Sequence, residues 1–239
     1  MRRAVFSLAL FLIATPVLAL SDAPYISTAD IDLLKLLPPP PEATSPTQAS
    51  DMAAVLAAQK ARTPEEVARI IADAQVSVFR FADVLGPQFT KQNLPKLDAF
   101  FTKLLIESNQ VGVAAKDVWA RPRPFETNSG VEPPGDLKKS VLNAQGRMTY
   151  SYPSGHAAFG LISAIVLSDM VPEKRAELFA RARNYGNIRV TSGLHYPSDV
   201  EGGRLYAEAV AGVVMQKAAF RADMAEAKAE LRAALKLAP

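Results

Sequence analysis

The segment that most constrains the fold is residues 150–156, Tyr-Ser-Tyr-Pro-Ser-Gly-His, which opens directly into the apolar run of residues 157–167. Proline fixes one backbone angle, serine can cap a helix, and glycine lets the backbone approach a ligand. We therefore expect a helix over residues 157–170 whose first free N–H groups point at one place, an arrangement suited to an anion. Its small apolar residues suit burial on most sides. The simpler interpretation is an ordinary turn into a helix, with His156 on the surface.

Apolar residues recur at helical spacing through most of the chain, and no stretch alternates long enough to form a sheet. Thr63-Pro64-Glu65-Glu66 is a strong helix start, because threonine can cap and Glu66 can complete a capping box. This helix should continue to Phe81 and stop at Gly86. The sequence therefore predicts an all-α, single-domain helical bundle. The other expected helices cover residues 51–62, 93–108, 111–119, 172–188 and 197–217, followed by a polar, projecting tail at 219–237.

The first 19 residues have the pattern of a secretory signal, with Arg2 and Arg3, an apolar middle at residues 4–14, and small residues ending at Ala19. We expect cleavage after Ala19 and a secreted, periplasmic protein. The alternative is an uncleaved membrane anchor, although the apolar stretch is short for a membrane span. Residues 20–50 are rich in proline, including the run 38–41, and should form an arm that is wrapped or partly mobile. Residues 51–239 would then form the helical domain.

Composition excludes several classes of function. The 239 residues contain 27 Lys and Arg against 24 Asp and Glu, a formal net charge of +3. Without Arg2 and Arg3 the balance is 25 against 24, or +1, so affinity for nucleic acid polymers or for a membrane surface is not indicated. The chain has no cysteine, which excludes disulfides, thiolate catalysis and cysteine metal sites.

The chain has two histidines, His156 and His195, and the second lies four residues ahead of Asp199. Across a turn into a helix, that carboxylate can accept a hydrogen bond from one ring nitrogen and leave the other free as a nucleophile or base. Two histidines could instead bind a metal. A zinc site normally has a third protein ligand, however, and no suitable spacing is present.

Three cations, Lys116, Arg123 and Arg189, accompany the histidines, at places where we expect helices to break. Taken singly, each would be an ordinary surface charge. Together, they would repel a divalent metal and attract an anion. Phosphate is the common biological anion that two arginines and a lysine suit.

In chain order, these residues form three motifs: Lys116, six residues, then Arg123-Pro124; Pro153-Ser154-Gly155-His156; and Arg189, five residues, His195, three residues, Asp199. The pattern resembles the signature of the type 2 phosphatidic acid phosphatase (PAP2) superfamily, and within it the secreted bacterial class A non-specific acid phosphatases. The resemblance spans most of the chain after the signal. It implies the all-α bundle of this superfamily, a fold shared with vanadium haloperoxidases.

The resemblance also implies a phosphoric monoester hydrolase of broad range that needs no metal or cofactor. His195 would attack phosphorus to form a phosphohistidine, Asp199 would hold the imidazole, and His156 would protonate the leaving alcohol. The implied phosphate-binding groups are the side chains of Lys116, Arg123, Arg189 and Ser154 and the N–H of Gly155. The implied partners are small phosphomonoesters and inorganic phosphate. A homodimer or higher homo-oligomer is compatible with the sequence, which does not decide the matter.

The sequence departs from the family pattern in two places. Ile188 stands where a serine usually precedes Arg189, so a hydrogen bond behind the site is expected to be missing. Cysteines that often occur in this branch are absent, and Thr191-Ser192 stand where one is expected.

Three other functions stay open. The chain is short for a vanadium haloperoxidase, and lipid phosphatases of this superfamily usually have several membrane spans. A phosphate-binding protein without catalysis would explain the cations and leave the spacing of His195 and Asp199 unexplained. Trp119, Tyr150 and Tyr152 could line a leaving-group pocket or belong to the core, so the physiological substrate is not predicted.

Overall fold

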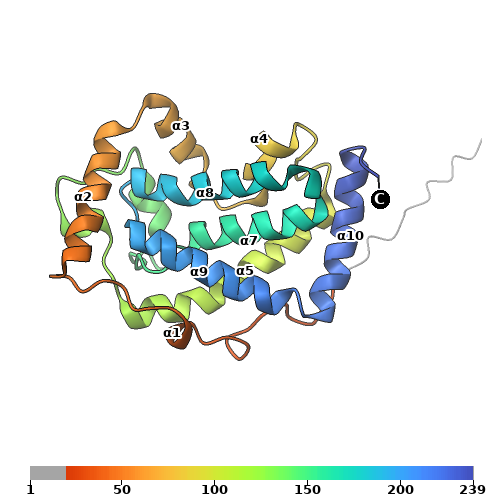
Figure 1. Ribbon diagram of the computed structural model, residues 1–239, viewed down its shortest axis with the longest axis horizontal. Helices are drawn as coiled ribbons and strands as arrows, with labels where there is room; N and C mark the ends of the chain where they lie inside the picture. Colours follow the sequence, from red (N-terminus) through yellow and green to blue (C-terminus); the bar gives the residue numbers. More distant parts are fainter. Residues whose placement is uncertain (1–19, 239) are drawn as a thin grey trace, which may run out of the picture.

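The computed structural model describes residues 20–238, and within that range it contains helices and no β-strand, so the prediction of an all-α bundle is confirmed (Figure 1). In the same range, one isolated antiparallel bridge joins Leu142 and Met148. The expected signal at residues 1–19 lies outside the described residues. The helices are α1 Leu33–Leu36, α2 Pro46–Ala61, α3 Pro64–Ala72, α4 Ala82–Leu85, α5 Pro95–Trp119, α6 Pro124–Thr127, α7 Gly155–Met170, α8 Arg175–Thr191, α9 Pro197–Val214 and α10 Ala218–Ala234, with 3-10 helices η1 Val78–Phe81, η2 Leu137–Val141 and η3 Pro172–Lys174.

Helix α7 is the centre of the bundle. It lies between α8 and α9 in Figure 1 and also contacts α5. Most of its side chains are buried, among them Ala157, Ala158 and Ile162. Small residues let the neighbouring helices approach closely, and a Cβ on Gly160 would lie 2.9 Å from the ring of Tyr185 on α8. The expectation that this helix is buried on most sides is confirmed.

The region after Thr63 differs from the prediction. The reciprocal capping box expected at Thr63 is present, but α3 ends at Ala72, so the prediction of one helix continuing to Phe81 is wrong. The chain leaves the helix at Asp73, whose two carboxylate oxygens each accept a 2.8 Å hydrogen bond from Arg181 of α8. This buried ion pair joins segments far apart in sequence, and local periodicity cannot reveal it.

Two other predicted extents are wrong. The helices expected over residues 93–108 and 111–119 are one continuous helix, α5. Gly112 lies inside this helix, and its missing side chain gives room to the ring of Tyr206, 3.1 Å from where a Cβ would lie. The tail expected to project at 219–237 is instead α10, which packs against α5 and buries Phe220 and Leu231 completely.

Residues 20–45 form an arm that is wrapped on the bundle. Tyr25 is fully buried, and its hydroxyl donates to Asp223 of α10 at 2.6 Å. These contacts attach the N-terminal part of the arm to the end of the bundle that α10 closes. Helix α2 begins at Pro46, earlier than the expected residue 51. Across residues 20–238, no helix is both long enough and apolar enough to cross a membrane.

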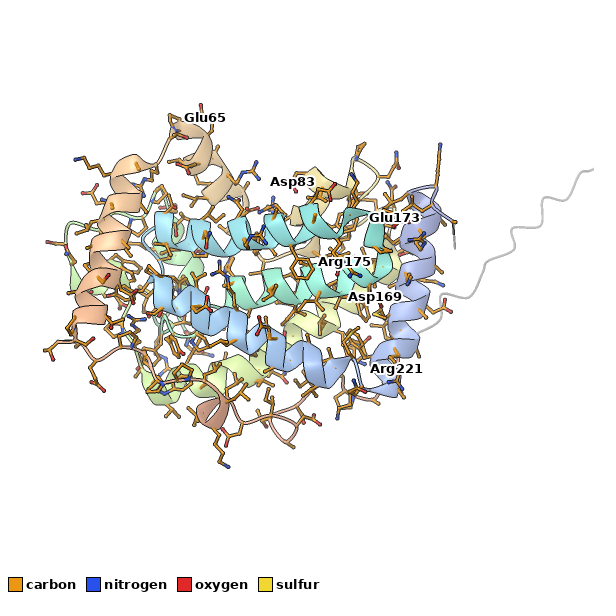
Figure 2. All side chains as sticks on the ribbon, in the orientation of Figure 1. Glu65, Asp83, Asp169, Glu173, Arg175 and Arg221 are labelled. Atoms are coloured by element: carbon orange, nitrogen blue, oxygen red, sulfur yellow. The ribbon has the colours of Figure 1, made fainter. Side chains whose placement is uncertain are left out.

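The helix ends determine where a site can form. Helices α7 and α9 begin, and α8 ends, at the end of the bundle that α2 covers, on the left in Figure 1. Helix α10 closes the opposite end, which Glu173 and Arg221 mark in Figure 2. The end beneath α2 is the one that collects the residues predicted to act.

Candidate active site

The turn ahead of α7 is fixed by the backbone of α9. Ser154 is the N-cap of α7, with its hydroxyl oxygen 3.4 Å from the N–H of Ala157, and Gly155 is the first helical residue. The N–H of Ser154 donates to the carbonyl of Asp199 at 2.9 Å. A Cβ on Gly203 would lie closer than 3.0 Å to the carbonyl oxygen of Ser154, so the two backbones approach as only glycine allows. The first N–H groups of α7 are therefore held in a fixed place.

His195 lies just beyond the end of α8, where Gly193, at φ 73°, turns the chain. Its Nδ1 lies 3.4 Å from Oδ2 of the fully buried Asp199, within ion-pair range but long for a hydrogen bond. Its Nε2 lies 3.2 Å from Nη1 of Arg123. A guanidinium can only donate, so Nε2 accepts and the ring proton is on Nδ1, facing Asp199. In this tautomer Nε2 is unprotonated, and it can act as a nucleophile when Arg123 releases the lone pair that now accepts its hydrogen bond.

Burial and charge keep the His195 ring neutral in the free protein. Burial, and after it the positive charge of Arg123, lowers the pKa of His195 well below its usual range. Burial raises the pKa of Asp199, and the charge of Arg121 opposes that rise. The pKa of the imidazole is thus lowered and that of the neighbouring carboxyl raised, in each case mainly by burial.

Carbonyl groups ahead of the turn hold two of the predicted cations. Arg123 donates from Nε to the carbonyl of Thr149 at 2.7 Å, and Lys116 donates from Nζ to the carbonyl of Tyr150 at 2.9 Å. Burial, then the charge of Arg123, lowers the pKa of Lys116 to about 7. Burial, then the charge of Arg189, lowers the pKa of Arg123 to about 10. Positive charges therefore face one another at close range here.

Arg189, in the last turn of α8, is the most unusual residue of the site. It is fully buried, and among residues 20–238 none of its three guanidinium nitrogens has a hydrogen-bond partner. Burial lowers the pKa of Arg189 to about 10. Five N–H donors buried without acceptors are costly, so this is the arrangement of a group that binds an anion.

His156 lies in the first turn of α7, with Nε2 3.0 Å from the carbonyl oxygen of Ala74 in the break after α3. Because a carbonyl only accepts, Nε2 carries a proton and Nδ1 is the atom that can titrate. The ring packs on Tyr185, with centroids 5.7 Å apart. Burial, then the charge of Arg189, lowers the pKa of His156 well below its usual range. The wrongly predicted stretch after α3 thus supplies a contact to this histidine.

The structure brings the predicted side chains to one end of the bundle, although not all of them occupy the expected kind of position. Lys116 and Arg189 lie in the last turns of α5 and α8, so the prediction that they occupy helix breaks is wrong. Arg123 is the N-cap of α6. Cations at the C-terminal ends of helices also interact favourably with the helix dipole.

Ile188, which stands in place of the family's serine, belongs to the core. It is buried in a small apolar cluster whose other members are Ile70, Leu137, Val141 and Leu194. Within residues 20–238, no side chain replaces the missing hydrogen bond to Arg189.

The aromatic residues near the site have different surroundings. Tyr152 is buried and donates to the carbonyl of Pro38 at 2.6 Å, and Trp119 packs edge-on against it, with ring centroids 5.0 Å apart. Tyr152 therefore packs against the arm, and Trp119 lines a cavity together with prolines 39–41 of the arm. Tyr150 is exposed, and its backbone carbonyl accepts a hydrogen bond from Lys116.

Sequence reasoning missed Arg121. This arginine is buried, with Nη1 2.6 Å from Oδ1 of Asp199 and Nη2 2.9 Å from Oδ2 of Asp51 on α2. One signal was available, because Arg121 lies two residues from Arg123, and two buried cations so close together need a carboxylate for at least one of them. The acceptor for His156, the carbonyl of Ala74, is a backbone group and leaves no sequence signal.

Comparison with known proteins supports the same family. The model of the PAP2 superfamily matches residues 97–223, which contain every motif residue. A non-specific acid phosphatase of Providencia stuartii is 30% identical over 205 residues, covering 84% of this chain and 81% of the relative. An acid phosphatase of Zymomonas mobilis is 32% identical over 209 residues, covering 85% and 76%. A non-specific acid phosphatase of Salmonella typhimurium is 33% identical over 202 residues, covering 82% and 78%. With its motifs gathered at one site and a family match over more than half its length, this chain belongs to the PAP2 superfamily.

Proposed function

We propose that the protein is a secreted, periplasmic acid phosphatase that hydrolyses a broad range of phosphomonoesters without a metal, through a phosphohistidine intermediate. The similar proteins named acid phosphatases and the family match support the activity. The signal pattern of residues 1–19 supports the location. The observation that carries the proposal is the buried guanidinium of Arg189, which has no hydrogen-bond partner among residues 20–238 and whose charge acts on His195, the histidine with an unprotonated Nε2.

In the proposed reaction, Nε2 of His195 attacks phosphorus as the bond to the leaving oxygen breaks, and His156 gives a proton to the leaving alcohol. Water then attacks the phosphohistidine, His156 takes the water's proton, and the N–P bond breaks to release phosphate. Asp199 holds the Nδ1 side of His195 through both steps and balances the positive charge that the ring gains.

The phosphate oxygens would be held by Lys116, Arg123 and Arg189 together with the hydroxyl of Ser154 and the N–H of Gly155. Their role is electrostatic, since they stabilise the charge of the transferring phosphoryl group. Burial and, after it, the charge of Arg189 lower the pKa of His156, and a bound phosphate offsets that charge. Substrate binding should therefore raise that pKa and let His156 carry the proton it must donate.

The two histidines should fail in different ways when they are replaced. His195→Ala should abolish hydrolysis of an aryl phosphate and any base-stable phosphoenzyme, because no nucleophile remains. His156→Ala should slow turnover by about 10²–10⁴-fold, the usual contribution of general acid–base catalysis, and still bind phosphate. Steady-state kinetics and alkaline trapping of the phosphoenzyme measure both. Substantial turnover in His195→Ala would contradict the assignment of His195 as the nucleophile. A wild-type protein that binds phosphate without turnover would indicate a phosphate-binding protein in place of an enzyme.

Metal removal should leave activity unchanged, because the cations of the site do the electrostatic work. The measurement is hydrolysis of 4-nitrophenyl phosphate after dialysis against EDTA, with a zinc-dependent phosphatase treated in parallel as the control. Strong inhibition that added zinc or magnesium reverses would contradict the metal-free mechanism.

A further inference from the structure

Arg121 contacts Asp199, the carboxylate that faces the proposed nucleophile His195. It is 5% exposed, and its Nη1 lies 2.6 Å from Oδ1 of Asp199. The other oxygen of Asp199 lies 3.4 Å from Nδ1 of His195 and accepts the N–H of Tyr196 at 2.8 Å. The carboxylate therefore stands between a permanent cation and the imidazole, with one oxygen toward each.

Arg121 is itself held by α2. Its Nη2 lies 2.9 Å from Oδ2 of Asp51, and Asp51 also accepts the N–H of Ser198 at 3.3 Å and contacts the Ser198 hydroxyl. That hydroxyl accepts from Nη1 of Arg121 at 2.7 Å. The guanidinium carbon lies 4.1 Å from the ring centroid of Tyr196. Residues of α2 and of the start of α9 thus hold the guanidinium in one orientation.

The charges alternate along this row, from Asp51 to Arg121 to Asp199 and then to His195 when its ring becomes positive. A buried carboxylate with no cation nearby tends to take up a proton, and Arg121 opposes this at Asp199. Because Arg121 is shared with Asp51, it neutralises Asp199 only in part. Asp199 therefore keeps negative charge for the imidazole.

We propose that Arg121 is a positioning residue for the reaction, which holds Asp199 ionised and directed at Nδ1 of His195, and that Asp51 holds Arg121 in this role. The inference rests on the proposed phosphatase function and adds to it a pair of residues outside the three motifs. Arg121 and Asp51 act through Asp199 and do not touch the substrate. The rival explanation is that the pair only attaches α2 to the bundle.

The test compares Arg121→Met with Arg232→Met in the full chain. Arg232 is also buried and ion-paired, with Glu173 at 3.0 Å, but it lies on α10 at the opposite end of the bundle (Figures 1 and 2). Each variant loses a buried guanidinium that takes part in an ion pair, although Glu173 is itself about half exposed, whereas Asp51 and Asp199 are buried. Only Arg121→Met should lower kcat for 4-nitrophenyl phosphate, by about 10- to 100-fold, as is typical when a group that orients a reactive ligand is lost. The inhibition constant for sulfate should stay within about threefold of wild type, because the phosphate-binding groups are intact.

A pH profile separates positioning from attachment. Loss of the Arg121 charge should raise the pKa of Asp199 further, so the acid limb of kcat should move to higher pH in Arg121→Met and stay in place in Arg232→Met. Asp51→Asn keeps the shape and removes a negative charge, so the same limb should move to lower pH. The charged or titratable groups around Asp199 that bear on this profile are Arg121, Arg123, Lys116, His195, Tyr152 and, beyond Arg121, Asp51.

Chemical rescue provides a second measurement. Arg121 lines a cavity of about 400 Å³ together with Trp119 and Tyr196, so a small cation can reach its place. Millimolar guanidinium should restore part of the kcat of Arg121→Ala and leave Arg232→Ala unchanged.

The outcomes are distinct. An active wild type with unchanged kcat and an unmoved acid limb in Arg121→Met would overturn this inference and leave the phosphatase function intact. A wild type without phosphatase activity would overturn both. If Arg121→Met does not fold, Arg121→Lys takes its place, because it keeps the charge and loses the forked geometry. It should lower kcat without moving the acid limb, and a kcat equal to wild type would overturn the inference.

Discussion

The pKa of Lys116 is lowered much closer to neutrality than the pKa values of the two arginines of the site. Burial, followed by the charge of Arg123, lowers the pKa of Lys116 to about 7, while the pKa values of Arg123 and Arg189 are lowered only to about 10. Below pH 7 the lysine is protonated, and as the pH rises through 7 the free protein loses this charge. The affinity of the site for an anion should therefore fall above neutral pH.

Sulfate tests this titration, because its charge is constant where phosphate changes its own. The inhibition constant for sulfate should rise as the pH increases from about 6 to about 8.5, by at most about tenfold per pH unit above the pKa of Lys116. Lys116→Arg, which keeps its charge over this range, should flatten the curve. Competitive inhibition of aryl phosphate hydrolysis at each pH is the measurement. A wild-type inhibition constant independent of pH would contradict a lysine pKa of about 7.

At the residue scale, the chemistry made part of the site predictable. Lys116 and His195 stood out because their types and spacings serve one reaction, and the structure brings them to one end of the bundle. Arg121 was missed because its orientation depends on Asp51, which is 70 residues away in sequence. The carbonyl that orients His156 is invisible in sequence, since every residue has one.

At the scale of elements, the contact between α9 and the turn ahead of α7 depends on two adjacent glycines. A Cβ on Gly202 would meet the ring of Tyr152, and one on Gly203 would meet the carbonyl oxygen of Ser154, each closer than 3.0 Å. A ring can shift a little, whereas a backbone carbonyl at a helix cap cannot move without moving the turn. Gly212, on the same helix, has open space around it.

Gly203→Ala should therefore cost stability and activity together. We expect a loss of about 1–3 kcal/mol, as for other overpacked sites, and a lower kcat because the Ser154 turn is displaced. The matched control, Gly212→Ala, should gain up to about 1 kcal/mol of helix stability and keep its kcat. Urea unfolding and steady-state kinetics measure both variants. Equal behaviour of the two would show that the close approach is unimportant.

Local signals predicted where helices start better than where they end. The capping box at Thr63 and the serine cap of α7 depend on neighbours in sequence, and both are present. The end of α3 is accompanied by the ion pair of Asp73 with Arg181. The docking of α10 involves the contact of Asp223 with Tyr25 of the arm. Both partners are distant in sequence. Long-range packing decided these extents against local preference.

At the scale of the whole molecule, folding assembles a cationic site that opposes folding. Arg189 is buried with no acceptor among residues 20–238, and burial lowers its pKa to about 10, so the free protein bears the cost of this charge. The apolar packing of α7 against α8 and α9 must offset that cost. An anion that binds the folded state would relieve it.

Arg189→Met should accordingly raise the melting temperature in buffer without phosphate or sulfate. It should also remove most of the stabilisation that phosphate gives the wild type, which is about 2.7 kcal/mol at a ligand concentration of 100 Kd. Thermal unfolding with and without phosphate is the measurement. Arg232→Met is the control, since it should lower the melting temperature and keep the response to phosphate. A destabilised Arg189→Met in the anion-free buffer would contradict the account.

The arm and α2 lie ahead of residues 97–223, the part of the chain that the family model covers, yet both reach the site. The carbonyl of Pro38 accepts the hydroxyl of Tyr152, and Asp51 pairs with Arg121. A transplant of residues 97–223 into a foreign scaffold would carry every motif residue and still lack these two supports. A segment that carries the whole site together with these two contacts must therefore begin ahead of residue 97, where the family match starts.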